Sequence, residues 1–284
     1  KEIFMENLNN ETQTKKTFWQ KIKKPFLFTI AFLPIIIVAS IFTSLYTFDL
    51  YPPEMLEEAI AAVGSKTMVI LVTVIQNIGM IGIVTFFGYI LAEKLGLIRS
   101  IKKDGKIKIF EKKAILVTCI VSVICGILFS LDYWTFGAVI PQIQQADGLG
   151  LTPISFVASI LYGGICEELM LRLFVLSLFA FIIWKVFFRK SAKLQSENNS
   201  QVQISPVVFL IANIVASLLF AAGHLPATQV TFGITPLILF RCFLYNGGMG
   251  YIFGWLYIKY GLQYSMLSHA LCHIVSKVIW LLFI

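Results

Sequence analysis

The sequence predicts an all-α protein of the membrane, a single bundle of seven to eight transmembrane helices. Apolar residues make up 58% of the 284 residues and charged residues only 13%, compared with about 25% charged residues in soluble domains. The mean hydropathy is +0.83. Apolar runs long enough to cross a bilayer, about 20 residues each, recur along the chain. No long polar stretch leaves room for a second folded domain.

We expect a basic cytoplasmic tail over residues 1–24, followed by one transmembrane domain over 25–284. The first apolar run is too long for a signal peptide and has no small-residue cleavage site, which favours a retained anchor. In chain order, the predicted spans are 25–48, 67–92, 114–131, 152–188, 205–223, 235–258 and 262–284.

The fourth predicted span, 152–188, is longer than one ordinary crossing. It is either one long tilted helix or two pieces broken near Gly163 and Gly164, and the second alternative gives the count of eight. Glycines in the second span, at 79, 82 and 88, permit close helix packing.

Lysine and arginine concentrate in the N-terminal tail and in the loops 93–113 and 189–203, whereas the intervening loops carry acidic residues. The positive-inside rule therefore predicts a cytoplasmic N-terminus. The net charge of +8 follows from this loop pattern, so we expect the lipid bilayer as a partner and no nucleic acid. We expect an integral protein of the bacterial cell membrane.

Two adjacent carboxylates and an arginine, Glu167, Glu168 and Arg172, lie inside the fourth span. Each costs roughly 2.5–3.5 kcal/mol to place there on insertion scales, which makes it a candidate functional residue. Glu168 and Arg172 are four apart and can form an ion pair on one helix face. Glu167 points elsewhere and is free to act as a general base. The alternative is an ion pair that only fixes helix packing.

All three histidines lie in or beside apolar segments. His224 ends the span 205–223, where a histidine is often only a helix cap. His269 and His273 are four apart on the last span, and Lys277 extends the same face. Histidines at this spacing are typical metal ligands, and they can also line a polar cavity.

Arg241 lies inside another apolar span and requires an acidic partner. The acidic residues of the neighbouring spans are Glu167 and Glu168, so we expect one of them to bind Arg241. Asn246 and the glycines that follow it would let helices pack closely around a cavity.

Three motifs in order resemble the CAAX protease and bacteriocin-processing (CPBP, or Abi) family of intramembrane proteases. They cover roughly residues 163–284 and read Glu167-Glu168-x-x-x-Arg172, Phe220-x-x-x-His224 and His269-x-x-x-His273. The resemblance implies that Glu167 and His224 activate a water molecule. It also implies that His269 and the fourth residue after it stabilise the oxyanion. That fourth residue is usually asparagine in the family and is His273 here. Histidine can still donate a hydrogen bond, and it could equally favour a metal.

We therefore predict an intramembrane endopeptidase that hydrolyses a peptide bond in a membrane-associated peptide or protein. The catalytic candidates are Glu167, His224, His269 and His273, and the supporting candidates are Glu168, Arg172, Arg241 and Asn246. The same four catalytic residues are the candidates for metal ligands, with zinc as the metal left open. The alternative is a catalytically inactive scaffold of the same family that binds a membrane partner such as a sensor kinase. A transport site would predict inverted repeats, which the sequence does not contain.

Overall fold

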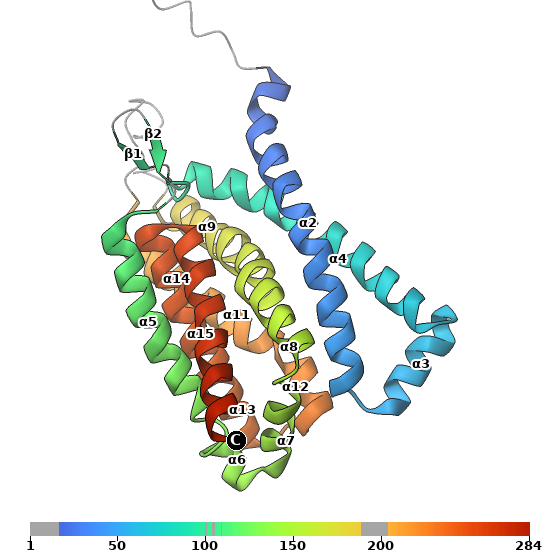
Figure 1. The fold of residues 1–284 in the computed structure, drawn as a ribbon. Coiled ribbons are helices and arrows are strands. Elements are labelled where there is room, and N and C mark those ends of the chain that lie inside the picture. The colour runs from blue at the N-terminus through green and yellow to red at the C-terminus, as the bar shows by residue number, and fades with distance from the viewer. Residues whose placement is uncertain (1–16, 100, 104–105, 109, 189–203) are drawn as a thin grey trace, which may run out of the picture.

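The computed structural model describes residues 17–99, 101–103, 106–108, 110–188 and 204–284. These residues form a bundle of helices with one short antiparallel hairpin, in which β1 (Ile101–Lys103) pairs with β2 (Lys106–Lys108). The predicted fold class, an all-α membrane bundle, is confirmed (Figure 1).

Six helices of the described residues are long and apolar enough to cross a membrane. Three of them are α2 (Phe18–Leu50), α4 (Lys66–Lys94) and α5 (Lys112–Ser130). The fourth extends over Pro153–Phe187, the fifth consists of α11 (Pro206–Gly223) with α12 (Leu225–Phe232), and the sixth is α15 (Leu262–Phe283). Short helices join them, namely α3 (Pro53–Val63), α6 (Phe136–Val139) and α7 (Pro141–Leu149).

The seventh predicted span, 235–258, lies in one continuous helical run that consists of α13 (Pro236–Cys242), the π-helical segment η3 (Phe243–Gly247) and α14 (Gly248–Tyr260). This run is nevertheless not among the six helices that are long and apolar enough to cross a membrane. The predicted count of seven to eight spans is therefore not confirmed.

The long fourth helix is unbroken, which decides between the two alternatives for 152–188. It begins at α8 (Pro153–Ala158), where the Thr152 side chain caps the first turn, and ends with α9 (Ser177–Phe187). Between them lie two π-helical segments, η1 (Ser159–Glu167) and η2 (Leu169–Leu176). π-Helical turns are rare and often occur at functional sites.

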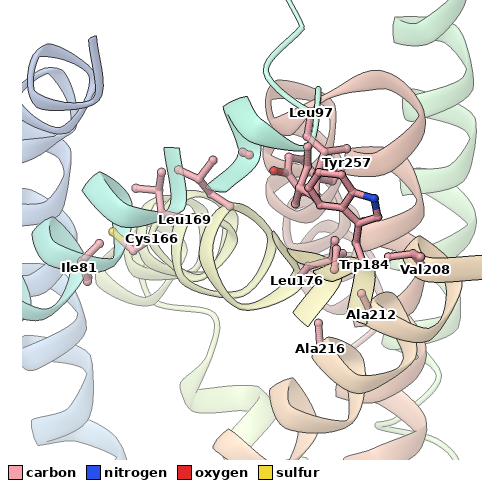
Figure 2. Packing of buried hydrophobic residues seen from close by; sticks show 14 of the residues in the cluster. Ile81, Leu97, Cys166, Leu169, Leu176, Trp184, Val208, Ala212, Ala216 and Tyr257 are labelled. Atoms are coloured by element: carbon pink, nitrogen blue, oxygen red, sulfur yellow. The ribbon is translucent and has the colours of Figure 1, made fainter. Parts of the chain in front are cut away.

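This helix is central to the apolar core. Cys166, Leu169 and Leu176 on one side of it are fully buried. Together with Ile81 of α4 and Tyr257 of α14 they belong to one packed cluster (Figure 2). Apolar side chains such as Ile83, Leu116 and Leu282 are instead exposed on the outside, as expected where a helix faces lipid.

The arrangement around the long helix brings distant segments together. Helix α15 packs against both α5 and η1, and α14 packs against α11 and α15. Helices α2 and α4 pack on each other and on η1 and η2 respectively. The hairpin lies at the end of the bundle where α2 begins, whereas α3, α6 and α7 lie at the opposite end (Figure 1). The predicted tail up to residue 16 and the loop 189–203 lie outside the described residues, and the membrane orientation stays a prediction.

Candidate active site

The four predicted catalytic side chains line one cavity of about 190 Å³. Glu167 reaches it from the end of η1, His224 from the end of α11, and His269 and His273 from α15. Aromatic rings, including those of Tyr162, Tyr245 and Phe253, line much of the remaining wall. The fold thus gathers polar groups that are far apart in the chain.

The Glu167 carboxylate lies between two histidines. Its Oε1 is 4.0 Å from His224 Nε2, and its Oε2 is 4.0 Å from His269 Nε2. Both separations are too long for a direct hydrogen bond. A separation of this size suits a water molecule that bonds to both groups.

The backbone fixes the tautomer of His224. Its Nδ1 is 2.9 Å from the carbonyl oxygen of Phe220. A carbonyl can only accept, so Nδ1 carries the proton and Nε2 presents a lone pair in the neutral ring. His224 is the C-cap of α11, and this bond satisfies one of the carbonyls left free at the helix end. The Phe220 ring also meets the His224 ring edge-on at 4.7 Å. The spacing of the second motif is therefore explained by a local contact.

His269 is held by Glu168, the neighbour of the catalytic candidate. Its Nδ1 lies 2.9 Å from Glu168 Oε1. Because a carboxylate can only accept, Nδ1 carries the proton of the neutral ring. The other nitrogen, Nε2, faces Glu167. Glu168 also accepts a hydrogen bond from Ser265 Oγ and forms an ion pair with Arg172, whose Nε is 3.2 Å from Oε2.

The ion pair expected from the spacing of Glu168 and Arg172 is present, and both side chains are completely buried. The guanidinium group of Arg172 lies over the Phe220 ring, with 5.0 Å from Cζ to the ring centre. Its Nη1 and Nη2 have no hydrogen-bond acceptor among the described residues. The buried Glu168 carboxylate is thus shared by a guanidinium group and a histidine, and this contact positions the catalytic candidate His269.

His273 stacks on His269, with 5.0 Å between the ring centres and 25° between the planes. The Nε2 atom of His273 faces Gly163. A methyl group on Gly163 would lie 2.9 Å from His273 Nε2 and 3.6 Å from His269 Nε2. The absence of a side chain at Gly163 therefore lets the His273 ring approach the π-helical turn, whereas the contact with His269 would be an ordinary one. From the sequence, Gly163 was expected only as a possible break in the helix, although its position four residues before Glu167 is a signal that could have placed it at the site.

The expected partner of Arg241 is wrong. Arg241 binds neither Glu167 nor Glu168, and its guanidinium group holds Asp132 instead, with Nε 2.8 Å from Oδ1 and Nη2 on Oδ2. Asp132 is fully buried in the turn after α5. Acidic residues within the spans were the expected partners, whereas Asp132 lies in the turn that follows α5. Arg241 consequently belongs to a second polar cluster at that end of the molecule.

Asn246 lines the cavity from η3, and its Nδ2 lies 3.4 Å from Cys242 Sγ. The expected close packing holds at Gly250, where a methyl group would lie 2.9 Å from the Phe220 ring. It does not hold at Gly248, which has open space around it.

The metal alternative does not match the geometry. Among the residues that the structure describes, no group of three or more histidine, cysteine, aspartate or glutamate side chains is arranged to hold a metal ion.

Residues 149–275 match the family model described as Type II CAAX prenyl endopeptidase Rce1-like. This match confirms the resemblance inferred from the three motifs, over the segment that runs from the end of α7 into α15. It supports a peptide hydrolase at the level of the family. No curated protein and no solved structure matches the chain.

Proposed function

We propose that this chain, with its Rce1-like segment, is an intramembrane endopeptidase that hydrolyses a peptide bond of a membrane-associated peptide or protein. The observation that carries the proposal is the position of the Glu167 carboxylate, 4.0 Å from each of two histidine nitrogens inside a cavity of the bundle. A carboxylate and a histidine about one water molecule apart can activate that water for attack on a carbonyl.

In the first step, a water molecule hydrogen-bonds to Glu167 and to His224 Nε2. Glu167 accepts a proton from the water as the water oxygen bonds to the carbonyl carbon of the scissile peptide. His224 Nε2 accepts the second hydrogen bond and so turns the lone pair of the water toward the substrate. Because the Phe220 carbonyl holds His224 Nδ1, the ring cannot rotate away without losing that bond.

In the second step, the tetrahedral intermediate collapses. Its oxyanion is bound by His269 and His273, Glu167 returns the proton to the leaving nitrogen, and an acid and an amine are released. His269 can donate through Nε2 only as an imidazolium, because its Nδ1 proton already points at Glu168. That imidazolium takes its second proton from solvent before the substrate binds and keeps it throughout the cycle, beside the Glu168 carboxylate, which is itself paired with Arg172.

The test is cleavage of membrane peptides by the purified protein in detergent or lipid discs. A prenylated CAAX peptide is the first probe, since the name of the matched family describes that substrate. Glu167→Gln keeps the shape of the side chain and removes the base, so we expect a loss on the order of 10²–10⁴-fold in kcat. Glu57→Gln, an exposed carboxylate on α3, is the matched control and should not change the rate. If Glu167→Gln cleaves as fast as the unaltered protein, the proposed general base is wrong.

A further inference from the structure

A second cavity, of about 250 Å³, adjoins the active-site cavity. The two share the side chains of Tyr46, Phe129, His224, Tyr245 and Asn246. From this shared wall the second cavity extends toward α7, α12 and α13, at the end of the bundle away from the hairpin (Figure 1). A substrate bound at Glu167 could therefore extend past His224 into this space.

The charged groups around the second cavity differ in whether they have hydrogen-bond partners among the described residues. Arg241 lines it but is bound to Asp132 through two nitrogens. Lys277, on the neighbouring α15, donates to the carbonyl oxygen of Gly150 and lies 3.2 Å from Ser155 Oγ. Both cations therefore already have acceptors.

Asp147 on α7 is the exception. It lines the cavity, and its Oδ2 is buried without a hydrogen-bond partner among the described residues. Burial, with the neighbouring Asp132 acting in the same direction, raises the pKa of Asp147 to about 7. A buried acceptor left without a donor is unfavourable, so a ligand that brings a donor to this carboxylate would gain the missing hydrogen bond.

We propose that this second cavity is a substrate subsite in which Asp147 selects a lysine or arginine side chain next to the scissile bond. This inference rests on the proposed function. The apolar stem of such a side chain would lie along the rings of Tyr46, Phe129 and Tyr245, and its charged end would meet Asp147. Long cationic side chains commonly bury the stem in this manner, and a hydrogen bond between charged groups is about twice as strong as a neutral one.

The experiment uses peptides that differ at one residue, placed in turn at each position flanking the cut. That residue is lysine, glutamine as a neutral donor, or norleucine with no donor. We expect the unaltered protein to cleave the best-placed lysine peptide with kcat/KM about tenfold above its norleucine counterpart. Asp147→Asn should reduce this ratio to about 1, Asp147→Lys should favour a glutamate peptide, and Glu57→Gln should keep the original ratio. Equal rates for the lysine and norleucine peptides at every position, equal rates for lysine and glutamine, or a ratio unchanged in Asp147→Asn would overturn the subsite.

Binding of the same peptides to the Glu167→Gln protein separates the two proposals. If no peptide is cleaved but the lysine peptide binds more tightly in a manner that requires Asp147, the subsite stands and the proposed function fails. If peptides are cleaved without a lysine preference that depends on Asp147, the proposed function stands and the subsite fails. Asp147→Glu keeps the charge, so it should keep a lysine preference in both assays even if Asp147→Asn does not fold. Loss of the preference in a folded Asp147→Glu protein would count against the subsite.

Discussion

A single methyl group at Gly163 should separate activity from stability. In Gly163→Ala the new carbon would lie 2.9 Å from His273 Nε2, closer than such atoms approach, so the imidazole ring has to move. The ring is stacked on His269 and meets Phe129 edge-on, so its displacement changes both of these contacts. We expect His273 to be displaced from its place in the cavity while the helix itself is preserved.

The magnitude follows from two opposing effects. Replacing glycine by alanine inside a helix stabilises it by roughly 0.5–1 kcal/mol, which offsets the small cost of moving the far end of one side chain. Loss of one oxyanion donor costs roughly 10²–10³-fold in kcat. Gly163→Ala should therefore melt near the temperature of the unaltered protein, yet cleave peptide about 100-fold more slowly.

Two other glycines supply the controls. A methyl group on Gly164 would lie 2.8 Å from Ala270 Cβ and 3.0 Å from its Cα. Backbone cannot give way as a side chain can, so Gly164→Ala should lose about 1–3 kcal/mol of stability through overpacking. Gly79 is exposed on α4 with nothing within 4 Å of the added carbon. Gly79→Ala should therefore lower neither the melting temperature nor the rate of peptide cleavage.

The assay is kcat for peptide cleavage beside thermal unfolding in the same detergent. A double variant, Gly163→Ala with His273→Asn, tests the cause, because the shorter asparagine removes the clash. It should cleave as fast as His273→Asn alone. If Gly163→Ala keeps full activity, or if the double variant is no faster than Gly163→Ala, then contact between Gly163 and His273 does not matter for catalysis.

Three further predictions concern single side chains. His273→Asn should keep most activity and His273→Ala should lose on the order of 2–4 kcal/mol of transition-state stabilisation; inhibition of the unaltered protein by chelators, with an inactive His273→Asn, would point instead to a metal ligand. Asp132→Asn leaves the charge of Arg241 without its partner and should cost about 3–5 kcal/mol in unfolding experiments, part of which Asp132→Asn with Arg241→Met should recover; a double variant no more stable than the single one would argue against the ion pair as the cause. The folded-state pKa of Asp147, about 7, is above its ordinary value of 3.8, so its contribution to stability is present below that ordinary value and is lost as the pH rises through about 7. Thermal unfolding across this pH range should show the decline in the unaltered protein and a flatter curve in Asp147→Asn, and two parallel curves would contradict it.

The residues of the candidate site were recognisable in the sequence because a bilayer penalises charge. Glu167, Glu168 and Arg172 are conspicuous inside an apolar run, and the i, i+4 spacing of Glu168 and Arg172 was enough to predict their ion pair, which the structure contains. The bond between His224 and the carbonyl of Phe220 is likewise a contact within one helix end. Both contacts join residues four apart in the chain, so helix geometry alone brings the two side chains or the side chain and the carbonyl together.

Contacts between helices were decided only by the tertiary structure. The binding of His269 by Glu168, the binding of Arg241 by Asp132 and the approach of His273 to Gly163 all join segments that are far apart in the chain. In a soluble bundle, the apolar face of each helix would indicate which residues point inward. In a membrane, the lipid-facing side is as apolar as the core, so the pattern of apolar residues does not say which side of a helix meets which neighbour. The sequence by itself therefore determined which polar groups are inside the membrane, and the packing of the helices determined how they are paired.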